Sequence, residues 1–204
     1  MVQRSLFLFA VLYGGMTCIA GVLGNKQVAL PGGLAVEAGI FAFLLLVVLS
    51  SAIAELHGRD AANRLVRFGF VPLLASMALI LLVLQLPPSP KMEPERMQGF
   101  QLILGQSPRL MLAGIIAYGI SQTLNVTLFS ALKRGERLLW LRAGVAGVLS
   151  QIVDTLLFIT IAFWGVFPIG ALLGGQMLSK VLLSALVVPP LIYGFVALGR
   201  RLDR

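Results

Sequence analysis

Cysteine, histidine and charged residues are all scarce in this chain. Its 204 residues include one cysteine, Cys18, and one histidine, His57. A single cysteine excludes a disulfide framework and a cysteine-based metal site, and we interpret Cys18 as a small buried apolar residue. Charged residues make up only 12% of the chain, against about 25% in a typical soluble domain. The sequence therefore predicts neither a metal site nor a cofactor, and it argues against a soluble fold.

Apolar residues are abundant instead, at 58% of the chain, with a mean hydropathy of +0.96. This composition is typical of an integral membrane protein, whose surroundings are the lipid bilayer. The formal net charge is +8, but the basic residues lie between apolar runs rather than in a tail. Their placement indicates membrane topology and not nucleic-acid binding.

The N-terminal stretch MVQRSLFLFAVLYGGMTCIAGVLG could pass for a signal peptide, because one arginine precedes an apolar core. Its apolar part has about 20 residues, the length that a membrane helix needs, whereas a signal core has about 7–15. No A-x-A cleavage pattern follows it. We therefore interpret this stretch as the first membrane-spanning helix.

Apolar windows predict six membrane spans and hence an all-α integral membrane protein, a six-helix bundle. The polar connection over residues 87–101 is rich in proline and should not form one continuous helix, although residues 95–104 could form a short interfacial helix. In the last span, Pro189 and Pro190 should break or kink the helix. The spans are residues 5–24, 33–55, 69–87, 109–132, 140–164 and 169–199 of a single transmembrane domain, residues 1–204.

The distribution of lysine and arginine predicts the orientation. If the N-terminus is cytoplasmic, eleven of the 16 basic residues lie inside, four lie outside, and Lys180 lies within a span. This excess follows the positive-inside rule, so both termini should face the cytoplasm. The inside group is Arg4, Arg59, Arg64, Arg67, Lys133, Arg134, Arg137, Arg142, Arg200, Arg201 and Arg204, and the outside group is Lys26, Lys91, Arg96 and Arg109.

Polar side chains of three spans reach similar depths in the membrane. From the helical rise, Asp154 lies about 15 Å and Lys180 about 17 Å from the outer ends of their spans, so the two opposite charges lie at nearly one level. Gln122 lies about 20 Å deep by the same rise, with Asn125 one turn further. Helical spacing forms three faces, namely Tyr118, Gln122, Asn125 and Phe129; Gln151, Asp154 and Phe158; and Gln176, Lys180 and Ser184.

Such a cluster lines either a binding cavity or a dry interface between helices. A charge at mid-depth costs about 3 kcal/mol or more unless it is paired or faces a cavity, which favours a functional role for Asp154 and Lys180. Polar side chains also hold membrane helices together, so helix packing is the competing interpretation, most of all for Tyr118 and Phe158.

Four further ionisable residues lie near the ends of the spans. Glu55 and His57 follow the second span beside basic residues, and we interpret them as a solvated helix end. Glu37 and Lys26 lie near the outer surface, where each could be part of a gate or simply a hydrated charge.

Three segments late in the chain carry a recognisable pattern, namely IAYGISQTLNVTLFSALKR, LRAGVAGVLSQIVDTLLFITIAF and GGQMLSKVLLSALVVPP. The pattern resembles the bacterial queuosine precursor transporters of the vitamin uptake transporter group. Weaker similarity lies in GNKQVAL and AELHG, so the resemblance extends over residues 20–200 and is specific in the last three spans. The matching residues are Tyr118, Gln122, Asn125, Phe129, Arg142, Ser150, Gln151, Asp154, Thr155, Phe158, Ala162, Phe163, Gln176, Lys180 and Pro189.

The resemblance implies a fold similar to the substrate-binding subunits of energy-coupling-factor transporters, in the plasma (inner) membrane of a bacterium. It also implies uptake of 7-deazaguanine bases, such as 7-cyano-7-deazaguanine or its aminomethyl analogue, for tRNA modification. The chain departs from the family pattern at Ser51, where an acid is common, at His57, where tyrosine is common, and at Asn125, which is often aspartate. A phenylalanine–proline pair expected early in that helix is Phe41-Ala42 here. These departures would make the site less acidic.

A polar cluster of this kind suits a purine-like base as the small-molecule substrate. The Asp154 carboxylate could accept from the N–H and amino groups of a guanine-like edge, and side-chain amides could read its carbonyl. An aromatic ring could stack on the base, while Lys180 would pair with Asp154 or contact the ligand's carbonyl. The candidate substrate-binding residues are Asp154, Gln151, Gln122, Asn125, Tyr118, Phe158, Lys180 and Gln176.

Other functions stay open at this point. The chain has no Walker A motif, so ATP use would need partner subunits, as in a substrate-binding subunit for another vitamin-like solute that works with an ATPase module. A scaffold whose polar cluster only joins helices is a third possibility. An enzyme is not expected, because His57 has no metal-ligand partners at a suitable spacing and Asp154 has no second mid-span carboxylate for acid–base chemistry.

Overall fold

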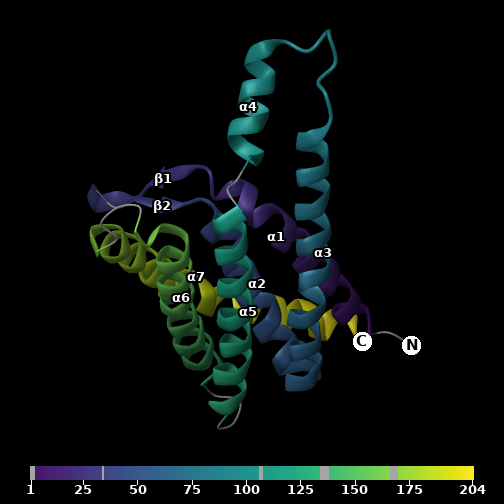
Figure 1. Cartoon of the computed structure of the whole chain (residues 1–204). Coiled ribbons are helices and arrows are strands. Elements are labelled where there is room, and N and C mark those ends of the chain that lie inside the picture. Colours follow the sequence, from purple (N-terminus) through teal and green to yellow (C-terminus); the bar gives the residue numbers. More distant parts are fainter. Residues whose placement is uncertain (1–2, 34, 106–107, 134–137, 166–169) are drawn as a thin grey trace.

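Helices account for most of the computed structural model, which describes residues 3–33, 35–105, 108–133, 138–165 and 170–204 (Figure 1). Six of its helices are long and apolar enough to cross a membrane, which confirms the all-α membrane bundle expected from the sequence. A seventh helix, α4 (Pro94–Leu104), lies in the connection where a short helix was predicted. The six long helices are α1 (Arg4–Leu23), α2 (Gly39–His57), α3 (Arg59–Gln85), α5 (Pro108–Ala131), α6 (Leu139–Phe163) and α7 (Gly170–Leu202).

The helix bounds differ from the apolar windows at three places. A β-hairpin, formed by β1 (Gln27–Ala29) and β2 (Ala35–Glu37), precedes α2, so this helix begins later than the window at residue 33. Helix α3 begins ten residues before its window, because its first turns are polar. Helix α7 continues through Pro189 and Pro190, so a break there is wrong, while the alternative of a kink stays a prediction. Membrane helices tolerate proline where neighbouring groups satisfy the freed carbonyls. The last window starts at Ile169, which lies outside the described residues.

Helix α2 forms the centre of the bundle. Its residues 46–54 are buried without interruption, so every face of this stretch is covered by protein. Helices α5, α6 and α7 pack in succession, while α2 contacts α1, α3, α5 and α7. The C-terminal end of α3 and helix α4 extend beyond the other helices, on the side where the β-hairpin lies (Figure 1).

Two glycines permit close contacts between these helices. Gly58 has a positive φ of 87°, a conformation that side chains disfavour, and this allows α3 to begin directly where α2 ends. At Gly69 on α3, an added Cβ would overlap the Tyr118 hydroxyl and lie 2.7 Å from the Tyr13 ring. Helices α1, α3 and α5 can therefore meet closely only with glycine at this position.

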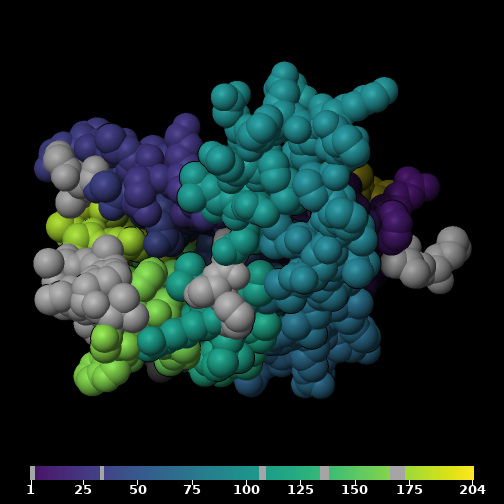
Figure 2. Space-filling view, turned by 45° about the horizontal axis from the view of Figure 1, so that its top comes forward, coloured from purple at the N-terminus to yellow at the C-terminus, as the bar shows by residue number. Residues whose placement is uncertain are grey.

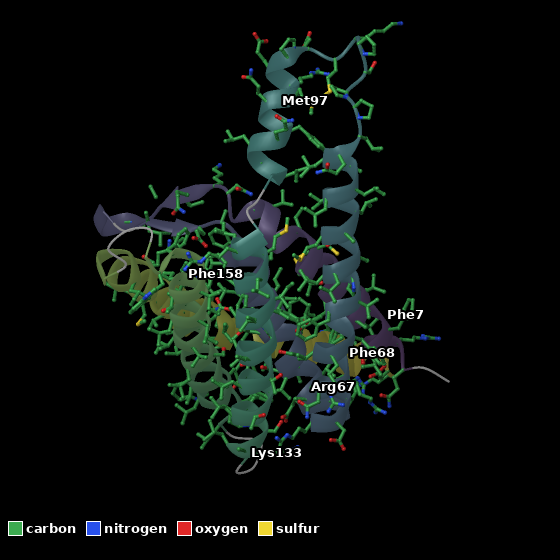
Figure 3. All side chains as sticks on the ribbon, viewed as in Figure 1. Phe7, Arg67, Phe68, Met97, Lys133 and Phe158 are labelled. Carbon is green, nitrogen blue, oxygen red and sulfur yellow. The ribbon has the colours of Figure 1, made fainter. Side chains whose placement is uncertain are left out.

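The surface of the bundle suits a lipid environment. Large apolar side chains project outward, including Phe7 and Phe68, which are 66% and 69% exposed (Figure 3). Arg67 and Lys133 lie towards the end of the bundle opposite Met97 of α4 (Figure 3). These basic residues belong to the predicted inside group, of which Arg134 and Arg137 lie outside the described residues. The chain is thus a multi-pass membrane protein.

Candidate functional site

A cavity of about 240 Å³ lies inside the bundle, towards the end that carries the β-hairpin and α4. All six long helices contribute to its wall, together with β2 and the last residues of α4. Figure 2 looks obliquely onto this end of the molecule, where α4 stands beside the hairpin. Most of the wall is apolar, and its ionisable or amide side chains are Asn25, Glu37, Gln151, Asp154 and Lys180, together with Cys18 and Tyr118.

Asp154 of α6 and Lys180 of α7 meet at the cavity wall, as the depth argument predicted. Lys180 Nζ lies 3.9 Å from Asp154 Oδ2, and both residues are buried. Ser121 of α5 donates to the other carboxylate oxygen at 3.2 Å. Because charge-assisted hydrogen bonds are usually about 2.7–2.9 Å long, the pair is an ion pair at contact distance without a strong hydrogen bond. Both groups can therefore take a further partner.

Gln151 lies one turn from Asp154 on α6 and is fully buried against the same cavity. Neither its amide nitrogen nor its amide oxygen has a hydrogen-bond partner among the described residues. Buried polar groups in folded proteins are nearly always hydrogen-bonded. Because the side chain has no exposed surface, a ligand in the cavity would supply the missing donor and acceptor after a small movement of the side chain.

Glu37 brings a second carboxylate to the cavity from β2. Its Oε1 accepts a hydrogen bond from Gln176 Nε2 at 3.2 Å, so Gln176 lies behind the wall and orients Glu37. Sequence reasoning placed Glu37 at the outer surface because the hairpin was not predicted. A carboxylate directly before a long apolar helix is the signal that could have drawn attention to it. In the described part of the chain, no three His, Cys, Asp or Glu residues lie close enough to hold a metal.

The two candidate aromatic residues differ in freedom. The Tyr118 hydroxyl donates to the Val66 carbonyl at 3.0 Å and lies 3.1 Å from the Tyr13 hydroxyl, so the ring is fixed in the wall. Phe158 is half-buried, and its ring meets Phe163 edge to face at 6.3 Å between centroids. It lies between α6 and α5 near the hairpin end of the bundle (Figure 3). Of the two, Phe158 has more room to stack on a flat ligand.

Gln122 and Asn125 do not reach the cavity wall, although the sequence placed them on the face of Tyr118. Ser50 Oγ donates to Gln122 Oε1 at 3.3 Å, and Asn125 Nδ2 donates to Ser50 Oγ and Ser51 Oγ, each at 3.1 Å. Two of the departures from the family pattern, Ser51 and Asn125, are therefore in direct contact. This end of the α5 face is turned towards α2 and forms a second polar layer beyond the cavity.

Two further interpretations from the sequence are wrong. The side chains of Glu55 and His57 are 8% and 6% exposed, and Glu55 pairs with Arg142 at 2.9 Å, so this is not a solvated helix end. The end of α2 is covered by α6 and by the chain termini, because His57 Nε2 lies 2.7 Å from Ser5 Oγ. Cys18 is only half-buried and lies at the cavity rather than in a dry core.

Comparisons with known proteins agree with the pattern in the last three spans. Residues 37–194 match the family described as "Putative vitamin uptake transporter". The chain is 32% identical over 161 residues to the probable queuosine precursor transporter of Bacillus subtilis (strain 168). The aligned region covers 78% of this chain and 69% of the relative. No solved structure matches the chain significantly, so the likeness to energy-coupling-factor subunits stays a prediction.

Proposed function

The chain belongs to the vitamin uptake transporter family, and from this membership we propose that it imports a 7-deazaguanine base for tRNA modification. The substrate would be a queuosine precursor such as 7-cyano-7-deazaguanine or its aminomethyl analogue. The name of the Bacillus relative, a probable queuosine precursor transporter, supports this class of substrate. We further propose that the protein lies in the bacterial plasma (inner) membrane with both termini in the cytoplasm, so that the cavity opens towards the outside.

One observation carries the proposed site. Gln151 is fully buried on the cavity wall, and both of its amide atoms lack partners in the part of the chain that the structure describes. The Asp154–Lys180 pair lies beside it. The unpaired Gln151 amide destabilises the protein when no ligand is bound, because an unsatisfied buried donor or acceptor costs about 1–3 kcal/mol. A polar ligand in the cavity would offset that cost.

The chemistry of a guanine-like base matches these groups. Its N–H and exocyclic amino group would donate to the Asp154 carboxylate, while its carbonyl would accept from Lys180 or from the Gln151 amide. Phe158 would stack on the ring. At about 240 Å³, the cavity is somewhat smaller than the roughly 300–1,000 Å³ usual for ligand pockets. It therefore suits a small flat base better than a bulky cofactor.

The remaining candidates support the site without contacting the base directly in this proposal, Tyr118 from within the wall and the others from behind it. Tyr118 holds α5 against α3 through the Val66 carbonyl, and Gln176 orients Glu37. Gln122 and Asn125 form the second polar layer with Ser50 and Ser51, so they would affect binding indirectly or contact the base only as it moves on.

Complementation tests both the substrate class and the site. The chain is expressed in bacteria that can neither make nor import queuosine precursors, a 7-deazaguanine base is supplied at low concentration, and queuosine in tRNA is measured. Wild type should restore the nucleoside, Asp154→Asn should not, and the exposed control Asp60→Asn should behave as wild type. If well-expressed wild type restores nothing with any precursor base, the proposed substrate is wrong.

Ligand protection of Cys18 tests binding separately from transport. Cys18 is the chain's one cysteine and lies at the cavity. A bound base should slow the modification of Cys18 by a thiol reagent, whereas an unrelated base without the guanine-like edge should not. Equal modification rates with and without every 7-deazaguanine base would contradict the proposed site.

A further inference from the structure

A chain of buried polar groups, not hydrogen-bonded to one another throughout, extends from the cavity towards the opposite half of the bundle. It starts at Ser121, which donates to Asp154 Oδ1 at 3.2 Å. Gln122 follows Ser121 on α5 and accepts from Ser50 of α2, which in turn accepts from Asn125. We call this chain the polar file, and its members are Ser121, Gln122, Ser50, Asn125 and Ser51.

The polar file is incompletely hydrogen-bonded. Gln122 Nε2 and Asn125 Oδ1 are fully buried and have no partner within the described ranges. Polar residues that serve only to hold helices together satisfy one another, because a buried unpaired group is costly. These two unpaired atoms, one donor and one acceptor, could form hydrogen bonds with a polar molecule that passes between α2 and α5.

The file ends at an ion pair one helical turn further on. Glu55 lies four residues after Ser51 on α2, and Phe129 lies four residues after Asn125 on α5. Arg142 of α6 joins these positions, because its Nη1 lies 2.9 Å from Glu55 Oε2 and its Nε donates to the Phe129 carbonyl at 3.1 Å. The guanidinium also lies 4.2 Å from the centre of the Phe129 ring. Three helices are therefore held together at this level.

A second cavity, of about 440 Å³, is an open depression at the surface of the bundle, and it reaches Glu55 of this ion pair. Glu55 lies in its wall, so one carboxylate belongs both to the ion pair and to the second cavity. The rest of the wall comes from the start of α6 and the end of α7, including Arg200, Arg201 and Arg204. The second cavity thus lies at the end that carries the chain termini.

We propose that the substrate path runs from the first cavity along the polar file to the second cavity, and that the Glu55–Arg142 pair closes this path at the inner end. The inference rests on the proposed transport function. The pair suits this role chemically, because a guanine-like base carries a carbonyl for the guanidinium and an N–H edge for the carboxylate. While the pair opens, the base can bond to Arg142 in place of Glu55 and to Glu55 in place of Arg142, so neither charge is left unpaired.

Cys18 provides a test that needs no substrate. In membrane vesicles of known orientation, a charged, membrane-impermeant methanethiosulfonate is added from one face, and modified Cys18 is measured by mass. Wild type should react from the hairpin face and only slowly from the face of the termini. Glu55→Gln should raise the rate from the termini face at least about tenfold, because loss of one partner strongly destabilises a buried ion pair.

Two further variants keep the result interpretable. Glu93→Gln removes an exposed ion pair, Glu93–Arg96 at 3.5 Å, and should leave both rates unchanged. Arg142→Lys keeps the charge but loses the planar fork that bonds Glu55 and Phe129 together, and it should raise the inner rate less than Glu55→Gln. It also serves as the test if Glu55→Gln does not insert into the membrane.

Two outcomes would overturn the proposed path. One is an inner-face rate that stays at the wild-type value in correctly inserted Glu55→Gln and Arg142→Lys. The other is wild-type Cys18 that reacts equally fast from both faces, since no closed barrier would then exist. Failure of every base in the complementation assay, combined with the expected change in labelling, would reject the proposed substrate and leave the path intact.

Discussion

The two ends of the bundle use buried polar residues in opposite ways. At the hairpin end, the site layer of Gln151, Asp154 and Lys180 is loosely bonded, with an ion pair at 3.9 Å and an amide that no described residue contacts by a hydrogen bond. At the other end, Ser5 and Asp203 lie 2.5 Å apart through a side-chain hydrogen bond, and a second bond of 3.0 Å runs from the Ser5 backbone N–H. We call the residues Ser5, His57 and Asp203 the terminal clasp.

Hydrogen-bond accounting shows how complete the terminal clasp is. The Ser5 hydroxyl has one hydrogen, which it donates to Asp203 Oδ2, so His57 Nε2 must donate to the Ser5 oxygen at 2.7 Å. Each group thus has its partner, and the clasp ties the first turn of α1 to the ends of α2 and α7. A complete network holds helices in place, whereas an incomplete one awaits a ligand. The contrast is what the proposed site predicts, with a structural role for the clasp and a binding role for the site layer.

The largest effect should come from replacing the charged pair of the site layer by apolar residues. We expect Asp154→Leu combined with Lys180→Met to reduce uptake at least about a hundredfold, since two charged hydrogen-bonding groups at about 1.5–3 kcal/mol each are lost. The unfolding temperature in detergent should change little, because replacing a buried ion pair by apolar residues is often neutral or stabilising. Uptake in vesicles and thermal unfolding would be measured on the same preparations.

The single variants provide the control for this experiment. Asp154→Leu alone leaves Lys180 as an unpaired buried charge and should destabilise the protein by about 3–5 kcal/mol. A double variant that still transports at the wild-type rate would mean that the pair only joins α6 to α7.

The next effect sharpens the difference between a satisfied and an unsatisfied polar group. Gln151→Leu removes an amide that has no hydrogen-bond partner among the described residues, so stability should stay the same or rise. Uptake should fall about tenfold or more, because a buried group made for a polar ligand is worth about 1–3 kcal/mol. The matched control is Gln98→Leu on the exposed face of α4. A clear loss of stability in Gln151→Leu would show that the amide has a structural partner.

Much of this architecture follows from the sequence, because it depends on local patterns. Long apolar runs determine the helices, and the helical rise placed Asp154 and Lys180 at one level before any contact was known. The β-hairpin was missed, since strands of three residues leave no periodic signal in the sequence. The position of Glu37 was missed for the same reason, because its carboxylate reaches the cavity from β2.

Contacts between residues far apart in the chain could not be predicted from the sequence. The face of Tyr118, Gln122 and Asn125 is correct as a helix face, but only the packing decides that its inner half meets α2 instead of the cavity. The Glu55–Arg142 pair joins residues that are 87 positions apart, and neither residue carries a local signal of the other. Burial therefore reversed the interpretation of Glu55 from a hydrated helix end to the partner of a buried arginine.

A smaller effect is expected from the terminal clasp. Ser5→Ala removes the acceptor of His57 Nε2 and the side-chain donor to Asp203, and it should destabilise the protein by about 1–3 kcal/mol. Uptake per folded molecule should not change, because the clasp lies away from the cavity. Ser89→Ala in the exposed connection before α4 is the control. Loss of uptake in a Ser5→Ala protein of normal stability would show that the clasp contributes to transport and not only to stability.

The smallest effect is a pH dependence confined to the clasp. Hydrogen bonds from the Ser5 side chain and backbone lower the pKa of the Asp203 carboxyl from its ordinary value of 3.8, with a further contribution from His57. A carboxyl whose pKa is lower in the folded state stabilises the protein above its unfolded pKa, and this stabilisation is lost as the pH falls through the folded pKa. Asp203 lies beyond the end of α7 and is partly exposed, so solvent keeps the effect small. The unfolding temperatures of wild type and Asp203→Asn in detergent should therefore differ by a constant amount near neutral pH and converge below pH 3.8. A difference that persists undiminished in that acidic range would mean that Asp203 stabilises the clasp by its shape and not by its charge.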